Sequence, residues 1–277
     1  MTQTIIKKSR KTGLYFVESL GDGVELEMVL IKGGTFTMGA PEDEEGSTDD
    51  ERPQHQVTVP TFFMGKYQVT QAQWKAVAKL PEVERELKAE PSNFKGDNRP
   101  VEKVSWYDAV EFCARLSNHT KRKYSLPSEA EWEYACRAGT TTPFHFGETI
   151  TSDLANYNAT STYGNASEGE YREETTPVGS FGLANAFGLC DMHGNVDEWC
   201  LDDWHDNYEG APTDGSAWFD DKNDNLYQRQ GTGVLRGVSW DSDPVDCRSA
   251  CRLNYAWREL IDDAIGFRLA CGVGRTS

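Results

Sequence analysis

The sequence lacks several features that would assign the protein to common functional classes. No stretch approaches the roughly 18 consecutive apolar residues of a membrane span, and Met1–Gly13 is basic without the apolar run of a secretory signal. Positive charge is scarce, with 28 Lys and Arg against 45 Asp and Glu, so the formal net charge is −17. Because phosphate backbones and anionic lipid surfaces are bound by clustered positive charge, we expect neither a nucleic-acid nor a membrane partner.

The cysteines and histidines also lack the spacing of known sites. Seven cysteines are scattered along the chain without a CxxC pair, and their number is odd. Together with the missing leader, this favours reduced thiols and a cytoplasmic location. The sequence contains no HExxH motif, no GxSxG motif and no glycine-rich phosphate loop. Ordinary hydrolytic machinery is therefore not expected.

The pattern of the chain predicts one α+β domain over residues 23–277, after a lead-in or linker of residues 1–22. Capping residues Thr70, Ser105 and Ser128 are predicted to begin three helices, the last ending near Gly139. No long helix is expected after Gly139, where acidic loops follow at 161–174 and 202–225. Loops of this length normally count against a compact domain unless they are functional or held by bound ions. Alternating apolar residues predict strands at 14–19, 25–31, 35–39, 54–59, 62–69 and 265–271.

Residues 240–264 have neither a helical nor a strand period, although both flanks read as core. The segment is rich in Asp, Tyr, Trp and Arg, and aromatic residues and arginine are enriched in binding surfaces. An irregular segment between two core strands indicates a contact surface held on a rigid frame.

Six motifs that cover the chain from Val24 to Cys271 resemble the formylglycine-generating enzyme (sulfatase-modifying factor) superfamily, in the order of that family. The resemblance implies a C-type-lectin-like fold of the formylglycine-generating-enzyme type, loop-rich with low regular secondary structure and usually with bound calcium. The motifs are GGTFTMG (33–39), FMGKYQVTQAQW (63–74), RPVEKVSWYDAVEFC (99–113), YSLPSEAEWEYACRAG (124–139), FGLCDMHGNVDEW (187–199) and the final LRGVSW…GFR.

The superfamily contains oxidases, sulfoxide synthases and non-catalytic binding modules, among them the variable proteins of diversity-generating retroelements. The oxidases bind copper through two cysteine thiolates five positions apart. Here Ser242 takes the first position, and Cys247 takes the second only if no gap is allowed. Sulfoxide synthases require a histidine-rich iron site, whereas the five histidines here lie on unrelated segments. Copper therefore belongs only to an alternative hypothesis, a formylglycine-generating oxidase or a diverged enzyme.

The resemblance also implies two calcium sites built from hard oxygen ligands. The first would use Asp191, the carbonyl oxygens of Gly194 and Val196, and Glu198. The second would use Asn156, the carbonyl oxygen of Tyr157, Glu170 and the carbonyl oxygen of Arg172. Between the first set of ligands, Asp197 stands where the family usually has a tryptophan.

We therefore expect a non-catalytic, monomeric variable protein that binds an unknown protein or small-molecule ligand, with no catalytic residue assigned. The acidic residues of the segment favour a basic or polar partner, although Arg252 and Arg258 oppose this. The expected ligand-binding residues are Trp240, Asp241, Asp243, Asp246, Asn254, Tyr255, Trp257, Arg258, Glu259, Asp262 and Asp263.

Overall fold

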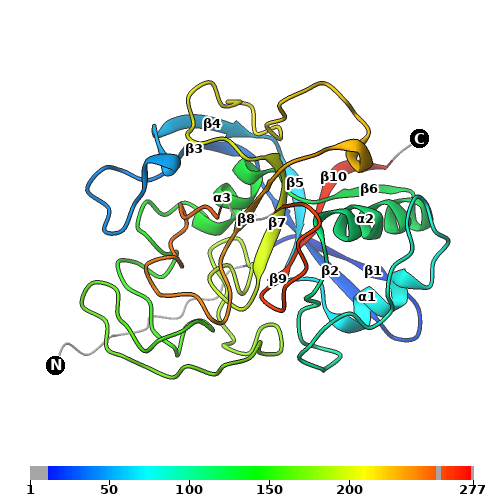
Figure 1. The fold of residues 1–277 in the computed structure, drawn as a ribbon, viewed down its shortest axis with the longest axis horizontal. Coiled ribbons are helices and arrows are strands. Elements are labelled where there is room, and N and C mark those ends of the chain that lie inside the picture. Colours follow the sequence, from blue (N-terminus) through cyan, green and yellow to red (C-terminus); the bar gives the residue numbers. More distant parts are fainter. Residues whose placement is uncertain (1–11, 254–256, 276–277) are drawn as a thin grey trace.

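A computed structural model describes residues 12–253 and 257–275, and its largest sheet joins the two ends of the described chain (Figure 1). The strand order is β1-β2-β5-β10-β6, and all neighbours are antiparallel. β1 lies within the lead-in expected at residues 1–22 and pairs with β2 along its whole length. The strands are β1 (Tyr15–Ser19), β2 (Glu25–Ile31), β5 (Phe62–Gly65), β6 (Arg122–Ser125) and β10 (Ala270–Arg275).

Two smaller sheets complete the β-structure. One pairs β3 (Gly34–Met38) with β4 (His55–Val59). The other has the order β8-β7-β9 and consists of β8 (Gly233–Arg236), β7 (Asp197–Asp203) and β9 (Ile265–Gly266), with β7 and β9 parallel. The strands expected at 14–19, 25–31, 35–39 and 54–59 are confirmed to within two residues at each end.

The observed strands differ from the prediction in three places. The strand expected at 62–69 ends at Gly65. The strand expected at 265–271 divides into β9 and β10, which belong to different sheets, and the intervening Arg268 is fully buried with its side chain on Glu198. β7 was not predicted because six of its seven residues are buried, so it has no alternating pattern.

The three predicted helices are confirmed: α1 (Gln71–Ala78), α2 (Trp106–Thr120) and α3 (Glu129–Arg137). Each begins with a capping box, in which the side chain of the N-cap residue and that of the third helical residue each accept a bond from the other residue's backbone. Two short 3-10 helices lie at Asp49–Glu51 and Leu226–Gln228. Residues 138–196 contain neither helix nor strand and form the long green loops at the lower left of Figure 1.

Three apolar clusters hold these elements together. The largest lies under α1 and α2, where Trp74 stacks on Phe112 and the edge of Phe267 meets both rings. A second packs the buried face of α3, with Trp132, against β2, β4 and β5. A third, smaller cluster lies under the long loops and includes Cys247. Within the described residues, no helix has both the length and the apolar character needed to cross a bilayer.

Candidate functional site

The irregular segment 240–264 connects β8 to β9 and is held in place by arginines that point into the protein. Arg248, Arg252 and Arg258 are each at most 5% exposed, and each forms an ion pair with a carboxylate on a distant element. They replace the backbone ladder that the segment lacks, so its path is held although it has no regular secondary structure. The pairs are Arg248 with Glu51 at 2.6 Å and Glu44 at 2.8 Å, Arg252 with Glu129 at 2.7 Å, and Arg258 with Asp203 at 2.6 Å.

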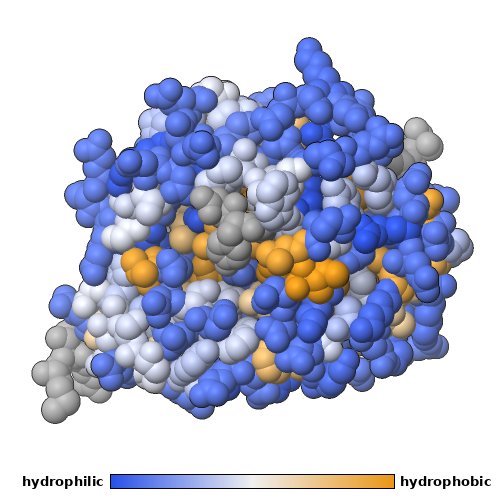
Figure 2. Space-filling view, viewed as in Figure 1, coloured by the Kyte–Doolittle hydropathy of each residue, from blue (hydrophilic) through white to orange (hydrophobic). Residues whose placement is uncertain are grey.

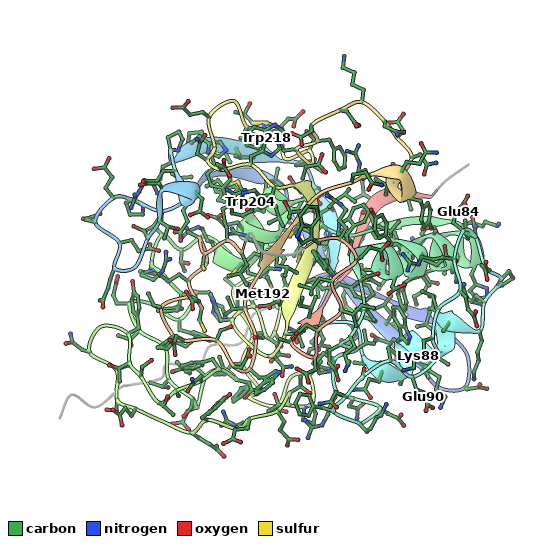
Figure 3. All side chains as sticks on the ribbon, viewed as in Figure 1. Glu84, Lys88, Glu90, Met192, Trp204 and Trp218 are labelled. Atoms are coloured by element: carbon green, nitrogen blue, oxygen red, sulfur yellow. The ribbon has the colours of Figure 1, made fainter. Side chains whose placement is uncertain are left out.

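Arg258 was expected at the ligand surface, and the structure corrects this expectation. The residue is 1% exposed, its Nη2 donates to Asp203, and its Nη1 donates to the carbonyl oxygen of Thr232 at 2.8 Å. Arg252 likewise faces inward, with its guanidinium 4.3 Å from the ring centroid of Trp204. Figure 3 shows Trp204 and Trp218 in the upper half of the molecule. The two arginines that opposed an acidic surface are therefore part of the interior.

The exposed side chains of the segment lie before Arg248 and on either side of Arg258. Trp257 is 66% exposed and Ile261 is 52% exposed. Asp241, Asp243, Glu259 and Asp262 are also exposed, whereas Trp240, Asp246 and Asp263 are partly buried. Asn254 and Tyr255 lie outside the described residues. On the face shown in Figure 2, hydrophobic residues gather near the centre of an otherwise hydrophilic surface.

The cysteines of this segment do not form a pair of reactive thiols. Cys247 is fully buried with its sulfur 3.6 Å from the carbonyl oxygen of Asp243, and Ser242 at the other position lies 3.1 Å from Ser239 between hydroxyl oxygens. Burial raises the pKa of the Cys247 thiol well above its usual range, and neighbouring acidic residues raise it further. Burial also raises the pKa of the Cys251 thiol. Neither sulfur is an accessible thiolate.

Cys136 and His193 approach one another, with 3.8 Å between Sγ and Nε2. Burial raises the pKa of Cys136 to about 12, and burial also lowers the pKa of His193 well below its usual range. A nucleophilic pair would need the opposite shifts, a depressed thiol pKa beside a protonated imidazole. This pair therefore stays a neutral thiol beside a neutral ring.

The oxygens expected at the first calcium site converge on the amide of Gln68, a residue that the sequence did not single out. Gln68 Nε2 lies 3.2 Å from the carbonyl oxygen of Gly194, 3.3 Å from that of Val196 and 3.0 Å from Glu198 Oε1. The carbonyl oxygen of Asp191 completes the set at 3.4 Å. Four acceptors surround a nitrogen that carries two hydrogens, and carbonyl and carboxylate oxygens are the ligands that a hard cation prefers, so this group of oxygens fits calcium in kind.

Two details differ from the expected ligand arrangement at this site. The Asp191 carboxylate accepts a bond from the Gly179 backbone N–H at 2.7 Å, and it is the carbonyl oxygen of Asp191 that lies near Gln68. Burial raises the pKa of Asp191 to about 6. Glu198 is already bonded by Arg268 at 2.6 Å and by the Trp132 indole at 2.7 Å. A calcium ion held by Gly194, Val196 and Glu198 would have to displace the Gln68 amide, and its presence stays a prediction.

The residues expected at the second calcium site are placed differently. Asn156 is buried and its Oδ1 has no hydrogen-bond partner. The Glu170 side chain is 66% exposed and pairs with Arg172 at 2.9 Å, and among the described residues no hydrogen bond or ion pair joins it to Asn156 or Tyr157. Within residues 12–253 and 257–275, no three His, Cys, Asp or Glu side chains form a group suited to a metal ion.

Two buried carboxylates beside segment 240–264 have oxygens without a partner. Asp197 begins β7 and is 2% exposed, and no hydrogen bond reaches its side chain from the described residues. Burial raises its pKa well above the usual range, and Asp241, Asp262 and Asp246 raise it further. Glu102 is fully buried, with Oε1 accepting from the Phe94 backbone and Oε2 unpaired. Burial raises the pKa of Glu102 to about 7.

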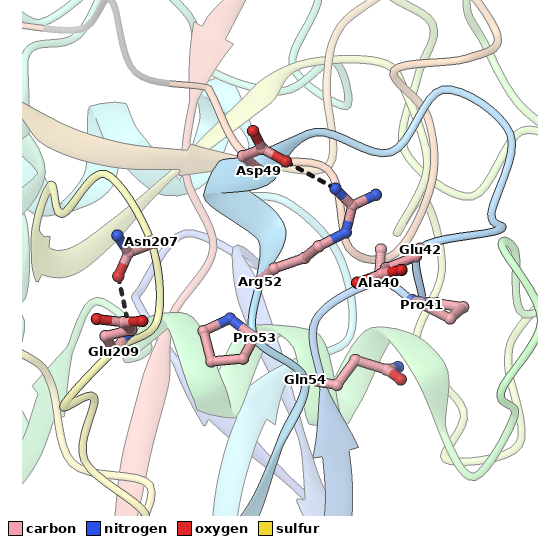
Figure 4. Close-up of a pocket in the computed structure, with 9 residues that line it drawn as sticks. All are labelled: Ala40, Pro41, Glu42, Asp49, Arg52, Pro53, Gln54, Asn207 and Glu209. Carbon is pink, nitrogen blue, oxygen red and sulfur yellow. Dashed lines mark hydrogen bonds and ion pairs between the residues drawn. The ribbon is translucent and has the colours of Figure 1, made fainter.

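A surface depression of about 490 Å³ lies away from these residues, beside the loop between β3 and β4 (Figure 4). Arg52 crosses it and pairs with Asp49 at 2.9 Å. None of the residues expected from the sequence to bind a ligand or a metal lines it. We therefore do not assign the functional site to this depression.

Comparison with known families identifies the chain. The model of the sulfatase-modifying factor enzyme 1-like domain matches residues 21–273, which is nearly the whole described structure. The chain belongs to this family. The resemblance carried by the six motifs is confirmed, and so is the C-type-lectin-like fold.

Curated members of the family have diverse names. The chain is 32% identical over 230 residues to chaperone protein LppX of Paenibacillus barcinonensis, covering 66% of this chain and 73% of that one. It is 31% identical over 275 residues to the serine/threonine-protein kinase pkn1 of Chlamydia caviae, of which it spans 38%. The bovine inactive C-alpha-formylglycine-generating enzyme 2 is 27% identical over 310 residues, with 92% and 91% of the two chains covered.

Two solved structures share the fold of this chain. PvdO from Pseudomonas aeruginosa matches with a TM-score of 0.78 and 36% identity, covering 96% of this chain and all of that one. Treponema denticola variable protein 1 matches with a TM-score of 0.74 and 24% identity, covering 94% and 100%. The second match shows the shared fold.

Proposed function

We propose that this member of the sulfatase-modifying factor enzyme 1-like family is a non-catalytic ligand-binding protein. In this proposal it is a variable protein of a diversity-generating retroelement, and residues 240–264 are its diversified surface. Exposed residues of the segment contact the ligand, whereas its buried arginines keep the fold unchanged. The bovine relative named as an inactive enzyme shows that the family includes members without the oxidase activity.

The proposal rests on the contrast between the buried arginines and the exposed side chains of segment 240–264. Arg248 and Arg252 are tied to carboxylates that lie more than a hundred positions earlier in the chain. Trp257, Ile261 and Asp262 project to solvent further along the segment, beyond these anchors. Substitutions at exposed positions away from packed features usually change stability by less than about 0.5 kcal/mol. Such a surface can change its sequence without changing its scaffold.

A displayed library tests the proposal. Asp241, Asp243, Trp257, Glu259, Ile261 and Asp262 are randomised together, and the library is selected against unrelated target proteins. We expect most members to stay folded and different targets to enrich different sequences. A matched library that randomises six exposed residues of the loop at 202–225 should yield fewer binders. Equal enrichment from both libraries would contradict the proposal.

Copper binding separates this proposal from the oxidase alternative. We expect the reduced protein to show no stoichiometric Cu(I) binding in competition with a chromogenic chelator, because Ser242 and the buried Cys247 do not supply two thiolates. Stoichiometric Cu(I) binding that disappears in Cys247→Ser would favour the oxidase. A neighbouring reverse-transcriptase gene with a near-copy of the 3′ end differing at adenines would support the variable protein.

A further inference from the structure

Asp197 is a buried carboxylate that forms no ion pair with the residues the structure describes. It is 2% exposed, its Oδ1 is enclosed, and no described residue donates a hydrogen bond to it. A buried, unpaired charge costs several kcal/mol in general, so proteins normally pair such groups or use them. The neighbouring Glu198 in the same strand shows the usual solution, because it receives bonds from Arg268, Trp132 and Gln68.

The position of Asp197 connects it to the proposed ligand surface. Its backbone N–H donates to the carbonyl oxygen of Ala264 at 2.8 Å, so β7 lies against the end of segment 240–264. Besides burial, the charged groups that act on it most strongly are Asp241, Asp262 and Asp246 of that segment, followed by Glu198. All of them are acidic. The described charged groups that act most strongly on Asp197 therefore give the site a negative field.

The arginines of the segment pair with other carboxylates. Arg248, Arg252 and Arg258 are all engaged by carboxylates on the opposite side, at 2.6–2.7 Å. The segment therefore presents acids outward and keeps its basic groups inward. The acidic residues and the arginines, which favoured opposite partners in the sequence, therefore occupy different places in the structure.

Three aromatic rings lie close to Asp241. Trp240 precedes Asp241 and meets Phe94 edge-on at 5.4 Å, and it stacks on Tyr171 at 6.2 Å between ring centroids. Asp241 in turn influences Tyr171 electrostatically. Carboxylates beside aromatic faces suit an ammonium or guanidinium group on an alkyl stem, because the rings attract the cation and cover the stem.

We propose that Asp197, with Asp241 and Asp262, forms a subsite for an organic cation, namely the ammonium or guanidinium group of a ligand bound at segment 240–264. This inference rests on the proposed binding function and adds the chemistry of the ligand. The group inserts toward Asp197 and supplies the hydrogen-bond donor that the described protein does not. The same chemistry can come from a lysine or arginine side chain of a partner or from a free polyamine.

Calorimetric titration of the full chain tests the subsite with defined probes. The cationic probes are n-butylamine, agmatine, spermidine and the capped tripeptides acetyl-Ala-Lys-Ala-amide and acetyl-Ala-Arg-Ala-amide, and 1-butanol is the neutral probe. We expect at least one cation to bind and 1-butanol not to bind. Asp197→Asn keeps the shape and removes the charge, and it should weaken binding at least tenfold. Asp224→Asn, an exposed acid elsewhere, is the matched control and should bind like the wild type.

The outcomes separate the subsite from the wider proposal. Tighter binding of the tripeptides than of spermidine would support a polypeptide side chain, and the reverse would support a free polyamine. Should Asp197→Asn fail to fold, Asp241→Asn is titrated instead and should also weaken binding. Unchanged affinity in the variant, binding of no cation, or binding of calcium alone would each overturn the inference. The randomised-library result would be unaffected by that failure.

Discussion

Asp197 and Glu198 are consecutive residues of β7, and both are buried carboxylates, yet their surroundings are opposite. Glu198 faces the scaffold and is bonded by Arg268 through both oxygens, at 2.6 and 2.7 Å. Asp197 faces segment 240–264 and has no partner among the described residues. Because successive side chains of a strand point to opposite sides, one strand separates two environments. The scaffold side satisfies its charges, and the ligand side leaves them to be satisfied.

The same contrast extends across the molecule. On the scaffold side, buried arginines cross between elements and end on carboxylates, as Arg236 does on Glu133. Removing one member of such a pair leaves a buried charge that water cannot reach. On the ligand side, Glu102 and Asp197 each have one carboxylate oxygen that receives no hydrogen bond from the described residues. Stability and binding therefore draw on different sets of buried acids.

Breaking one of the buried arginine–carboxylate pairs should have the largest effect on stability. Arg248→Met removes the cation that holds Glu51 and Glu44 and releases the middle of the segment from the loop at 44–51. We expect the free energy of unfolding in urea to fall by about 3–5 kcal/mol. Arg85→Met is the control, because its pair with Asp108 is partly exposed and should be worth less than about 1 kcal/mol. Equal losses would show that the buried pairs are not special.

Gln68 marks the first expected calcium site, and its occupancy can be tested by adding calcium. Gln68→Glu replaces the central amide nitrogen with an oxygen, so five oxygens then face one another. We expect this variant to be less stable than the wild type in EDTA and to recover in CaCl2. A ligand at 100 times its Kd adds about 2.7 kcal/mol to the folded state. Urea unfolding curves that are the same with and without calcium, for both proteins, would contradict the calcium prediction.

Removing the unpaired carboxylate of Asp197 should increase stability, whereas removing a paired arginine decreases it. Asp197→Asn removes a buried carboxylate that lacks a donor and lies among acids, so we expect the free energy of unfolding at pH 7 to rise by about 1–3 kcal/mol. Asp224→Asn should leave it unchanged. A loss of stability in Asp197→Asn would mean that the carboxylate has a structural partner, and the contrast with Glu198 would fail.

The smallest expected effect is a change in the pH dependence of stability. The pKa of Glu102 is raised to about 7 in the folded protein, above its usual value near 4.5, so the folded state keeps its proton where the unfolded state has lost it. Its contribution to stability is therefore complete below pH 4.5 and is lost as the pH rises to 7. Glu102→Gln should make the decline of Tm between pH 4.5 and 7 shallower. A parallel decline in the variant and the wild type would contradict this.

Much of the fold was predictable from local patterns. The capping boxes at Thr70, Ser105 and Ser128 place the helix starts, because a cap depends only on residues three apart. β7 was missed because a fully buried strand has no alternation to detect. Among site residues, the substitution of Asp197 for the tryptophan usual in the family was the one visible signal. Gln68 carried none, because its role depends on carbonyl oxygens more than a hundred positions away.

The sequence by itself determined the family, the helices and the position of the irregular segment, since these depend on order and spacing along the chain. Only the tertiary structure decided which charges of that segment face outward. Arg258 and Asp262 are four residues apart, yet one is buried on Asp203 and the other lies at the surface. The difference arises because a buried charge is retained only where a partner from elsewhere in the chain reaches it. For Asp197, no described residue does so.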